Sequence, residues 1–231
     1  MEVKVLYSRP GMGQHIWITN DNGAVLIDTG DGILRDIRSN GLDIGQIRGV
    51  IFTHGHFDHM GGLYSLLGYL RLKGKEEVLP IFAPEGCAEV SSIVDSFTQC
   101  YRDTMHFKIP CTEVYSHEVF QIAEMDIEAY PVVHCGSIKG HEVLEEIPAV
   151  GYRFSYKGET VAVSGDTGDC ASLRELVKGA DLAIIEAVIE KSEHANDEVL
   201  KKVHLSEDLA KAIGRSAKNF ILVHRGGRQE P

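Results

Sequence analysis

The sequence lacks the features of a membrane-spanning or exported chain. No apolar run is long enough to cross a bilayer. The first six residues lack the basic, apolar and small-residue zones of a secretory signal. Only five cysteines occur in 231 residues and none forms a Cys-x-x-Cys pair, which argues against a disulfide framework and favours a reducing compartment. We therefore expect a cytoplasmic protein with no membrane partner.

Basic residues are also scarce. The chain has 23 lysines and arginines against 34 aspartates and glutamates, a formal net charge of -11. Such a surface repels a phosphate backbone, which argues against general nucleic-acid binding. A local anion site stays compatible with this charge, because bound metal ions bring positive charge of their own.

Short β-branched runs alternate with segments of helical spacing along the chain, and no linker or low-complexity tract divides it. We expect an α/β protein with sheets covered by helices, in one domain (residues 1–231) of two similar halves, about 1–125 and 126–231. The expected strands are 3–7, 16–19, 24–27, 50–53, 80–83, 127–133, 150–156, 160–164, 182–186 and 220–223. The expected helices are 31–40, 63–72, 85–99, 173–178 and 205–214, with 190–202 a solvated loop or surface helix.

Four titratable residues stand within a span of six, directly after the apolar strand expected at 50–53. They are His54, His56, Asp58 and His59. Folded proteins seldom place so many titratable groups where a buried strand ends, because each needs a partner. Imidazole nitrogens and carboxylate oxygens are ligands for zinc and its neighbours. The pattern predicts a pair of metal ions, and the alternative interpretation is a histidine-rich surface turn.

Three further candidate ligands follow other apolar strands. His134 comes after strand 127–133, Asp166 after the strand that ends at 164, and His224 after strand 220–223. Each lies just past the carboxyl end of its strand, where open α/β sheets place their sites. A lone histidine at such a place is more often a buried polar group with a partner. Their shared position favours one common site.

The segment His54-Gly55-His56-Phe57-Asp58-His59 resembles the His-x-His-x-Asp-His signature of the metallo-β-lactamase superfamily. The resemblance extends over nearly the whole chain and includes residues 26–30 and 164–167. It implies a metallo-β-lactamase-like αββα four-layer sandwich with metal ions at one edge. It also implies that one ion is held by His54, His56 and His134, the other by Asp58, His59 and His224, and that Asp166 bridges them.

The same resemblance implies the chemistry of the site. The ions would be a divalent pair, zinc by preference, with manganese or iron as alternatives, and a bridging hydroxide would be the nucleophile. Asp58 would be a catalytic residue as well as a ligand. Asp28 would orient ligands from behind the site.

Residues 184–187 and 204–206 resemble the Glu-Ala and His-Ser/Thr elements of the ribonuclease Z branch of this superfamily. The resemblance implies that Glu186 orients His204. His204 would then protonate the leaving oxygen or steady the phosphate charge.

The chain also departs from that branch. Residues 8–13 replace the usual Gly-Thr-Gly-like opening, and the long basic arm that clamps transfer RNA is missing. The segment 135–149 is instead longer and acidic. A small anionic ester is therefore at least as good a substrate as an RNA 3′ end. Arg225 and Arg228, which follow His224, are candidates for contact with a substrate anion.

The sequence thus predicts a dinuclear zinc-type hydrolase, a phosphodiesterase similar to ribonuclease Z. The alternatives are a hydrolase of another small ester (a thioester, lactam or sulfate ester) and a non-catalytic metal-binding scaffold. The expected partner is the substrate, a small anionic ester or an RNA 3′ end. A homodimer is also considered, because related proteins often dimerise.

Overall fold

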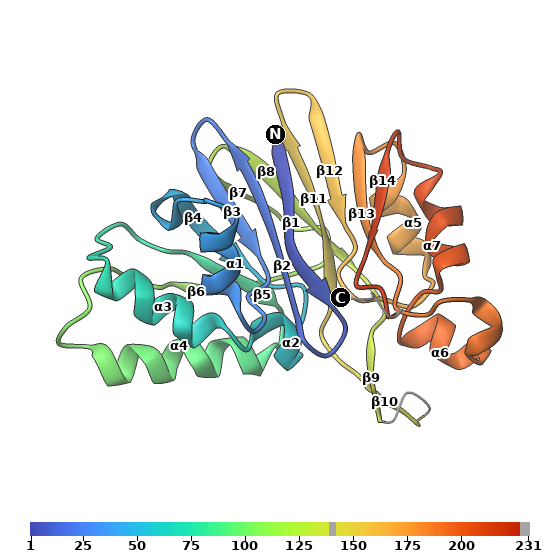
Figure 1. Ribbon diagram of the computed structural model, residues 1–231, viewed down its shortest axis with the longest axis horizontal. Helices are drawn as coiled ribbons and strands as arrows, with labels where there is room; N and C mark the ends of the chain where they lie inside the picture. The colour runs from blue at the N-terminus through green and yellow to red at the C-terminus, as the bar shows by residue number, and fades with distance from the viewer. Residues whose placement is uncertain (139–141, 227–231) are drawn as a thin grey trace. The chain divides into compact units, whose positions relative to one another are not determined.

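The computed structural model of the protein describes residues 1–138 and 142–226. The chain divides into two compact units, coloured blue to green and green to red in Figure 1. The first unit comprises Met1–Val114 and Ile122–Glu124, and the second comprises Tyr115–Gln121 and Met125–Pro231. Arg228 lies outside the described residues.

The first unit contains a six-stranded sheet in the order β1-β2-β3-β4-β5-β6. β1, β2 and β3 are antiparallel, whereas β3, β4, β5 and β6 run parallel, so the carboxyl ends of these last four strands share one edge of the sheet. The strands are β1 (Glu2–Arg9), β2 (Gly13–Asn20), β3 (Gly23–Ile27), β4 (Ile47–Ile51), β5 (Ile81–Pro84) and β6 (Cys111–Val114).

Helices of the first unit lie beside this sheet (Figure 1). Their apolar residues form one core with alternate strand residues, as when Leu26, Val50 and Phe52 cluster with Ile37 and Leu66. The helices are α1 (Ile33–Ser39), η1 (Ile44–Gln46), α2 (Phe57–Met60), α3 (Leu63–Leu72) and α4 (Ala88–Tyr101).

The second unit contains a six-stranded sheet in the order β14-β13-β12-β11-β8-β7, in which β12, β13 and β14 are parallel. The strands are β7 (Val119–Ile122), β8 (Met125–Pro131), β11 (Val150–Tyr156), β12 (Glu159–Val163), β13 (Leu182–Glu186) and β14 (Phe220–Val223). Ala162 and Ile185 of this sheet share a core with Leu173 and Ile213. The remaining elements are β9 (Cys135–Ile138), β10 (Glu142–Glu146), α5 (Ala171–Val177), η2 (Ser192–His194), α6 (Asp197–Lys202) and α7 (Glu207–Gly214).

The observed elements follow the predicted ones closely where a segment is strongly apolar. Helix 63–72 and strands 150–156, 182–186 and 220–223 have the predicted bounds. The predicted strand 50–53 lies too far toward the C-terminus, because the observed strand β4 ends at Ile51.

Most other predicted boundaries differ from the observed ones by one to three residues, as where strand 127–133 is observed as β8 at 125–131 and helix 85–99 as α4 at 88–101, and several short elements were not predicted. Helix 205–214 begins later than predicted, because the Ser206 hydroxyl accepts the Leu209 N–H at 3.4 Å and caps α7. Segment 190–202 divides into η2 and α6. The short elements α2, β6, β7, β9 and β10 were missed, because they are too short or too polar to show a period. No helix in the described part of the chain is long and apolar enough to cross a membrane.

Candidate metal centre

The first unit carries the four clustered candidates on one tight turn. His54 and His56 lie between β4 and α2, and Asp58 and His59 lie within α2. His54, Asp58 and His59 are buried, and His56 is half-buried. The turn is held against the end of β3, since Thr29 donates its N–H to His59 O at 2.6 Å. The structure therefore brings these four residues together.

A buried carboxylate behind the turn orients its ligand candidates. Asp28 follows β3, adopts a left-handed backbone with φ of 58°, and is fully buried. Its Oδ1 accepts the Thr53 N–H at 2.8 Å, and its Oδ2 accepts from the Thr53 hydroxyl at 2.9 Å and lies 2.8 Å from His59 Nδ1. Because a carboxylate only accepts, Nδ1 of His59 carries the proton and the lone pair lies on Nε2, the nitrogen that a metal ion would contact.

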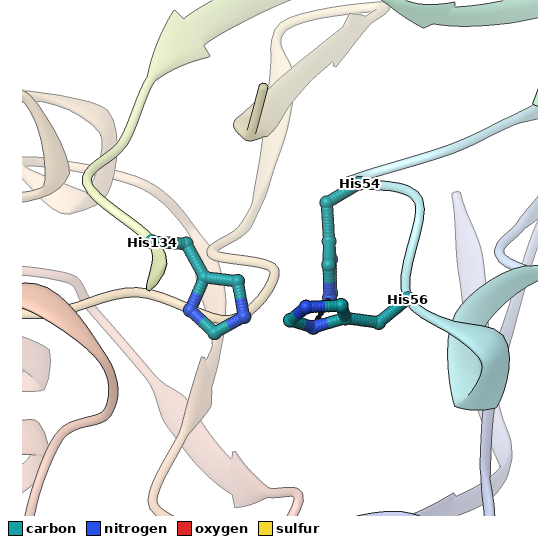
Figure 2. Close-up of side chains that lie close together, drawn as sticks. All are labelled: His54, His56 and His134. Carbon is teal, nitrogen blue, oxygen red and sulfur yellow. Dashed lines mark hydrogen bonds between the residues drawn. The ribbon is translucent and has the colours of Figure 1, made fainter. Parts of the chain in front are cut away.

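Thr53 extends this support to a second histidine. Its hydroxyl donates to Asp28, so its oxygen accepts from His54 Nδ1, 3.1 Å away. This arrangement again makes Nε2 the nitrogen for a metal. Figure 2 shows the rings of His54 and His56 meeting nearly edge to face, with His54 Nε2 at 3.1 Å from His56 Nδ1. Two lone-pair nitrogens this close are well placed to share one cation.

Asp58 is fixed by the N-terminal loop of the same unit. The Gly11 N–H donates to Asp58 Oδ2 at 2.7 Å, and that oxygen lies 4.0 Å from His59 Nε2. Close backbone packing requires glycine nearby, because a Cβ at Gly30 would lie 2.1 Å from Asp58 O. The loop and the turn therefore hold the carboxylate in place.

The second unit carries the other candidate ligands at the ends of three strands. His134 follows β8, Asp166 follows β12, and His224 follows β14 with φ of 52°. All three are buried. His224 Nε2 lies 3.3 Å from Asp166 Oδ2. His134, also labelled in Figure 2, donates from Nδ1 to Val203 O at 2.8 Å, so its lone pair lies on Nε2, the nitrogen that a metal ion would contact.

Glu186 and His204 form a pair inside the second unit. Glu186 ends β13, and its buried Oε1 lies 3.0 Å from His204 Nδ1. The same carboxylate accepts backbone N–H groups from Thr167, Val188 and Leu205. Burial opposes a charged imidazole, but the nearby carboxylates, chiefly Glu186, outweigh burial and raise the pKa of His204 above its ordinary value.

The ring of His204 also lies near the candidate ligands of its own unit. Its centroid is 5.3 Å from that of His134 and 6.5 Å from that of His224, and its Nδ1 is 3.8 Å from Asp166 Oδ2. The second unit thus gathers the three ligand candidates and the Glu186–His204 pair at the carboxyl ends of its strands.

Three supporting groups were missed by sequence reasoning. They are the Thr53 hydroxyl, the Gly11 N–H and the Val203 carbonyl. Two are backbone atoms, which no residue type reveals. Arg225, expected as a contact for a substrate anion, instead forms an ion pair with Glu207.

Comparison with known proteins places this architecture among characterised folds. Residues 24–224 match the family model of the Beta-lactamase superfamily domain. The chain is 25% identical to Ribonuclease BN of Erwinia tasmaniensis, covering 90% of this chain and 80% of that protein. It is 26% identical to Ribonuclease Z of Pyrococcus furiosus, covering 88% and 77%. The crystal structure of human tRNase Z, short form, is similar with a TM-score of 0.79 at 19% identity, covering 97% of this chain and 93% of that one. These matches confirm the fold class expected from the sequence.

Proposed function

The chain belongs to the beta-lactamase superfamily, and on that premise we propose that it is a metal-dependent hydrolase of phosphodiester bonds. One observation carries the proposal. Each unit presents buried histidine and aspartate side chains at the carboxyl ends of its strands, with ring nitrogens oriented by buried acceptors. The relatives named Ribonuclease BN and Ribonuclease Z, which align with about nine-tenths of the chain, support the choice of bond.

The donor set suits a pair of divalent cations. Imidazole nitrogens and carboxylate oxygens favour zinc, with manganese or iron as alternatives. When bound, such ions lower the pKa of water and balance charge on the attacking and leaving oxygens. We assign the candidate ligands as the family resemblance implies: His54, His56 and His134 to one ion, Asp58, His59 and His224 to the other, and Asp166 to both.

The chain's own side chains would handle the protons. Glu186 accepts from Nδ1 of His204, so Nε2 of His204 is the atom that donates a proton to the leaving oxygen. We assign His204 as the general acid and Glu186 as its positioning residue. Asp58, held by the Gly11 N–H, is also assigned a catalytic role, as the carboxylate that accepts a proton from the attacking water.

A short substrate fits this chain better than a long RNA. The net charge is -11, and Glu145 and Glu146 of β10 are exposed. Long RNA would meet repulsion over many phosphates, whereas a small phosphodiester presents only the one that the metal ions neutralise.

Replacement of Asp166 tests the function. Metal-replete wild-type protein should bind about two metal ions per chain by elemental analysis and hydrolyse bis-p-nitrophenyl phosphate. Asp166→Ala should lower turnover at least about 100-fold, because a bridging ligand is worth several kcal/mol of transition-state stabilisation. Asp126→Ala, which removes an exposed carboxylate of β8, is the control.

The outcomes separate the alternatives. Full turnover by metal-replete Asp166→Ala would refute the assignment. If the protein hydrolyses a thioester, lactam or sulfate ester but not the phosphodiester, its function is the hydrolysis of that other substrate. Metal binding without turnover of any ester would show that the protein is a non-catalytic metal-binding scaffold.

A further inference from the structure

An exposed aromatic ring stands between two candidate metal ligands. Phe57 separates His56 from Asp58 and is the first residue of α2. It is 67% exposed, although Asp58 and His59 beside it are buried. Exposed apolar side chains that occur singly are ordinary in soluble proteins. The position of Phe57 beside the proposed reaction centre distinguishes it from the others.

The backbone under Phe57 is fixed on both sides. Its carbonyl accepts the Gly61 N–H at 2.7 Å, and the carbonyl of His56 accepts from His59 and Met60 at 2.9 and 3.1 Å. The ring therefore stands on a rigid turn. A phenylalanine side chain has only two rotatable bonds, so it binds a flat partner at a low entropic cost.

A second exposed apolar residue comes from the loop that contacts this turn. Met12 is 54% exposed and follows Gly11, whose N–H binds the Asp58 carboxylate. The hydroxyl of Tyr7 lies 3.6 Å from Met12 Sδ. Gly11 and Asp58 are joined by the hydrogen bond from the Gly11 N–H. Met12 follows Gly11 in the sequence and Phe57 precedes Asp58, so both lie next to the bonded pair. The first unit thus has two exposed apolar residues, Phe57 and Met12, next in sequence to the hydrogen-bonded pair Gly11 and Asp58.

We propose that Phe57 is a specificity-determining residue that stacks on the nucleobase of a short nucleotide phosphodiester. The inference rests on the proposed function, which holds the phosphate at the metal ions. Stacking on an aromatic ring binds the flat face of a base and is tolerant of which base it is. An acidic protein with a net charge of -11 needs such a contribution, because its surface gives a nucleotide no general attraction. An alkyl ester has no flat ring to stack on Phe57.

Two phosphates that differ only in the base test the proposal. Isothermal titration of zinc-loaded protein should show that adenosine 5′-monophosphate binds about tenfold more tightly than ribose 5-phosphate. Phe57→Leu keeps an apolar side chain but removes the ring, and should reduce this ratio of affinities to about one. Phe57→Tyr keeps the ring and should retain the ratio. Leu72→Ala, which removes a 76% exposed apolar side chain at the end of α3, is the control.

Turnover supplies a second measure. Thymidine 5′-p-nitrophenyl phosphate and methyl p-nitrophenyl phosphate share a leaving group, and only Phe57→Leu should lower the ratio of their kcat/KM values. Equal wild-type affinity for the two titrated phosphates, or an unchanged ratio in Phe57→Leu, would overturn the role of Phe57 and leave the proposed function standing. If zinc-loaded protein bound neither phosphate, the proposed function would fail and this inference with it.

Discussion

The two units present the same kinds of side chain at strand ends but support them by different means. In the first unit a side chain, Asp28, supports His59 directly and His54 through Thr53. In the second unit the ligand candidate His134 is oriented by a backbone carbonyl, that of Val203. The buried carboxylate of the second unit, Glu186, instead supports His204, which is not a proposed ligand.

This contrast separates metal binding from proton transfer. A substitution behind the ligands of the first unit should weaken metal binding. A substitution of Glu186 should slow the reaction while metal stays bound. If substitutions in the two units changed metal binding and turnover in the same way, the proposed division of roles between the units would be wrong.

Among the substitutions that test this contrast, Glu186→Gln should have the largest effect. The amide cannot supply the charge that holds the proton on His204 Nδ1, and general acid catalysis is worth about 100-fold or more. Turnover of a dinucleotide phosphodiester, whose alkoxide leaving group needs a proton, should fall by about that factor, while elemental analysis shows unchanged metal content. Glu175→Gln, an exposed change on α5, is the control. Loss of metal together with turnover would show that Glu186 supports ligands instead.

Asp28→Asn should act on metal affinity. An amide in this position no longer demands a proton on His59 Nδ1, so the ring can present the wrong tautomer, and such outer contacts are worth about 10- to 100-fold in affinity. Competition with a chromophoric chelator measures the change. Asp103→Asn, at an exposed carboxylate of the same unit, should leave affinity alone. An unaltered affinity in Asp28→Asn would mean that packing alone orients His59.

A matched pair of threonines sharpens the comparison. Thr53→Val removes the hydroxyl that links Asp28 to His54 and should weaken metal binding by up to about tenfold. Thr167 of the second unit is equally buried, but its hydroxyl donates to Gly168 O at 2.8 Å. Thr167→Val should therefore cost about 1 kcal/mol of unfolding free energy with metal affinity unchanged. Equal losses of affinity in the two variants would contradict a specific link through Thr53.

The same contrast explains what the sequence could predict. Candidate ligands of the first unit stand in a row after one apolar strand, so local pattern alone identifies them. Those of the second unit are separated by long stretches of chain, and only their common place after apolar strands such as 160–164 and 220–223 suggested a joint site. The support of His134 joins residues 69 positions apart through a backbone carbonyl, which no local pattern encodes. The helix α2 is too short to show a helical period.

The smallest effect is expected at the opposite ends of the second unit's strands. Asp181 precedes β13, accepts from Thr160 N at 2.8 Å and Thr160 Oγ1 at 3.0 Å, and pairs with Lys218 Nζ at 2.6 Å. These contacts, led by Lys218, lower the pKa of its carboxyl from 3.8 to about 2. All three residues lie at the amino ends of β12, β13 and β14, away from the ends that carry Asp166, Glu186 and His224.

Because the folded-state pKa is lowered, the Asp181 carboxylate stabilises the fold above about pH 4, and this contribution is lost as pH falls toward about 2. The urea midpoint of Asp181→Asn should therefore lie below that of the wild type at about pH 6, and the two should converge near pH 2. Metal content and turnover at neutral pH should not change. A gap that persisted at the lowest pH would show that Asp181 acts through its hydrogen-bond geometry and not its charge. A change in metal content would mean that the amino ends of these strands are coupled to the carboxyl ends, which carry the candidate ligands. Residues that stabilise the fold and residues of the reaction would then not be separated at opposite ends of the sheet.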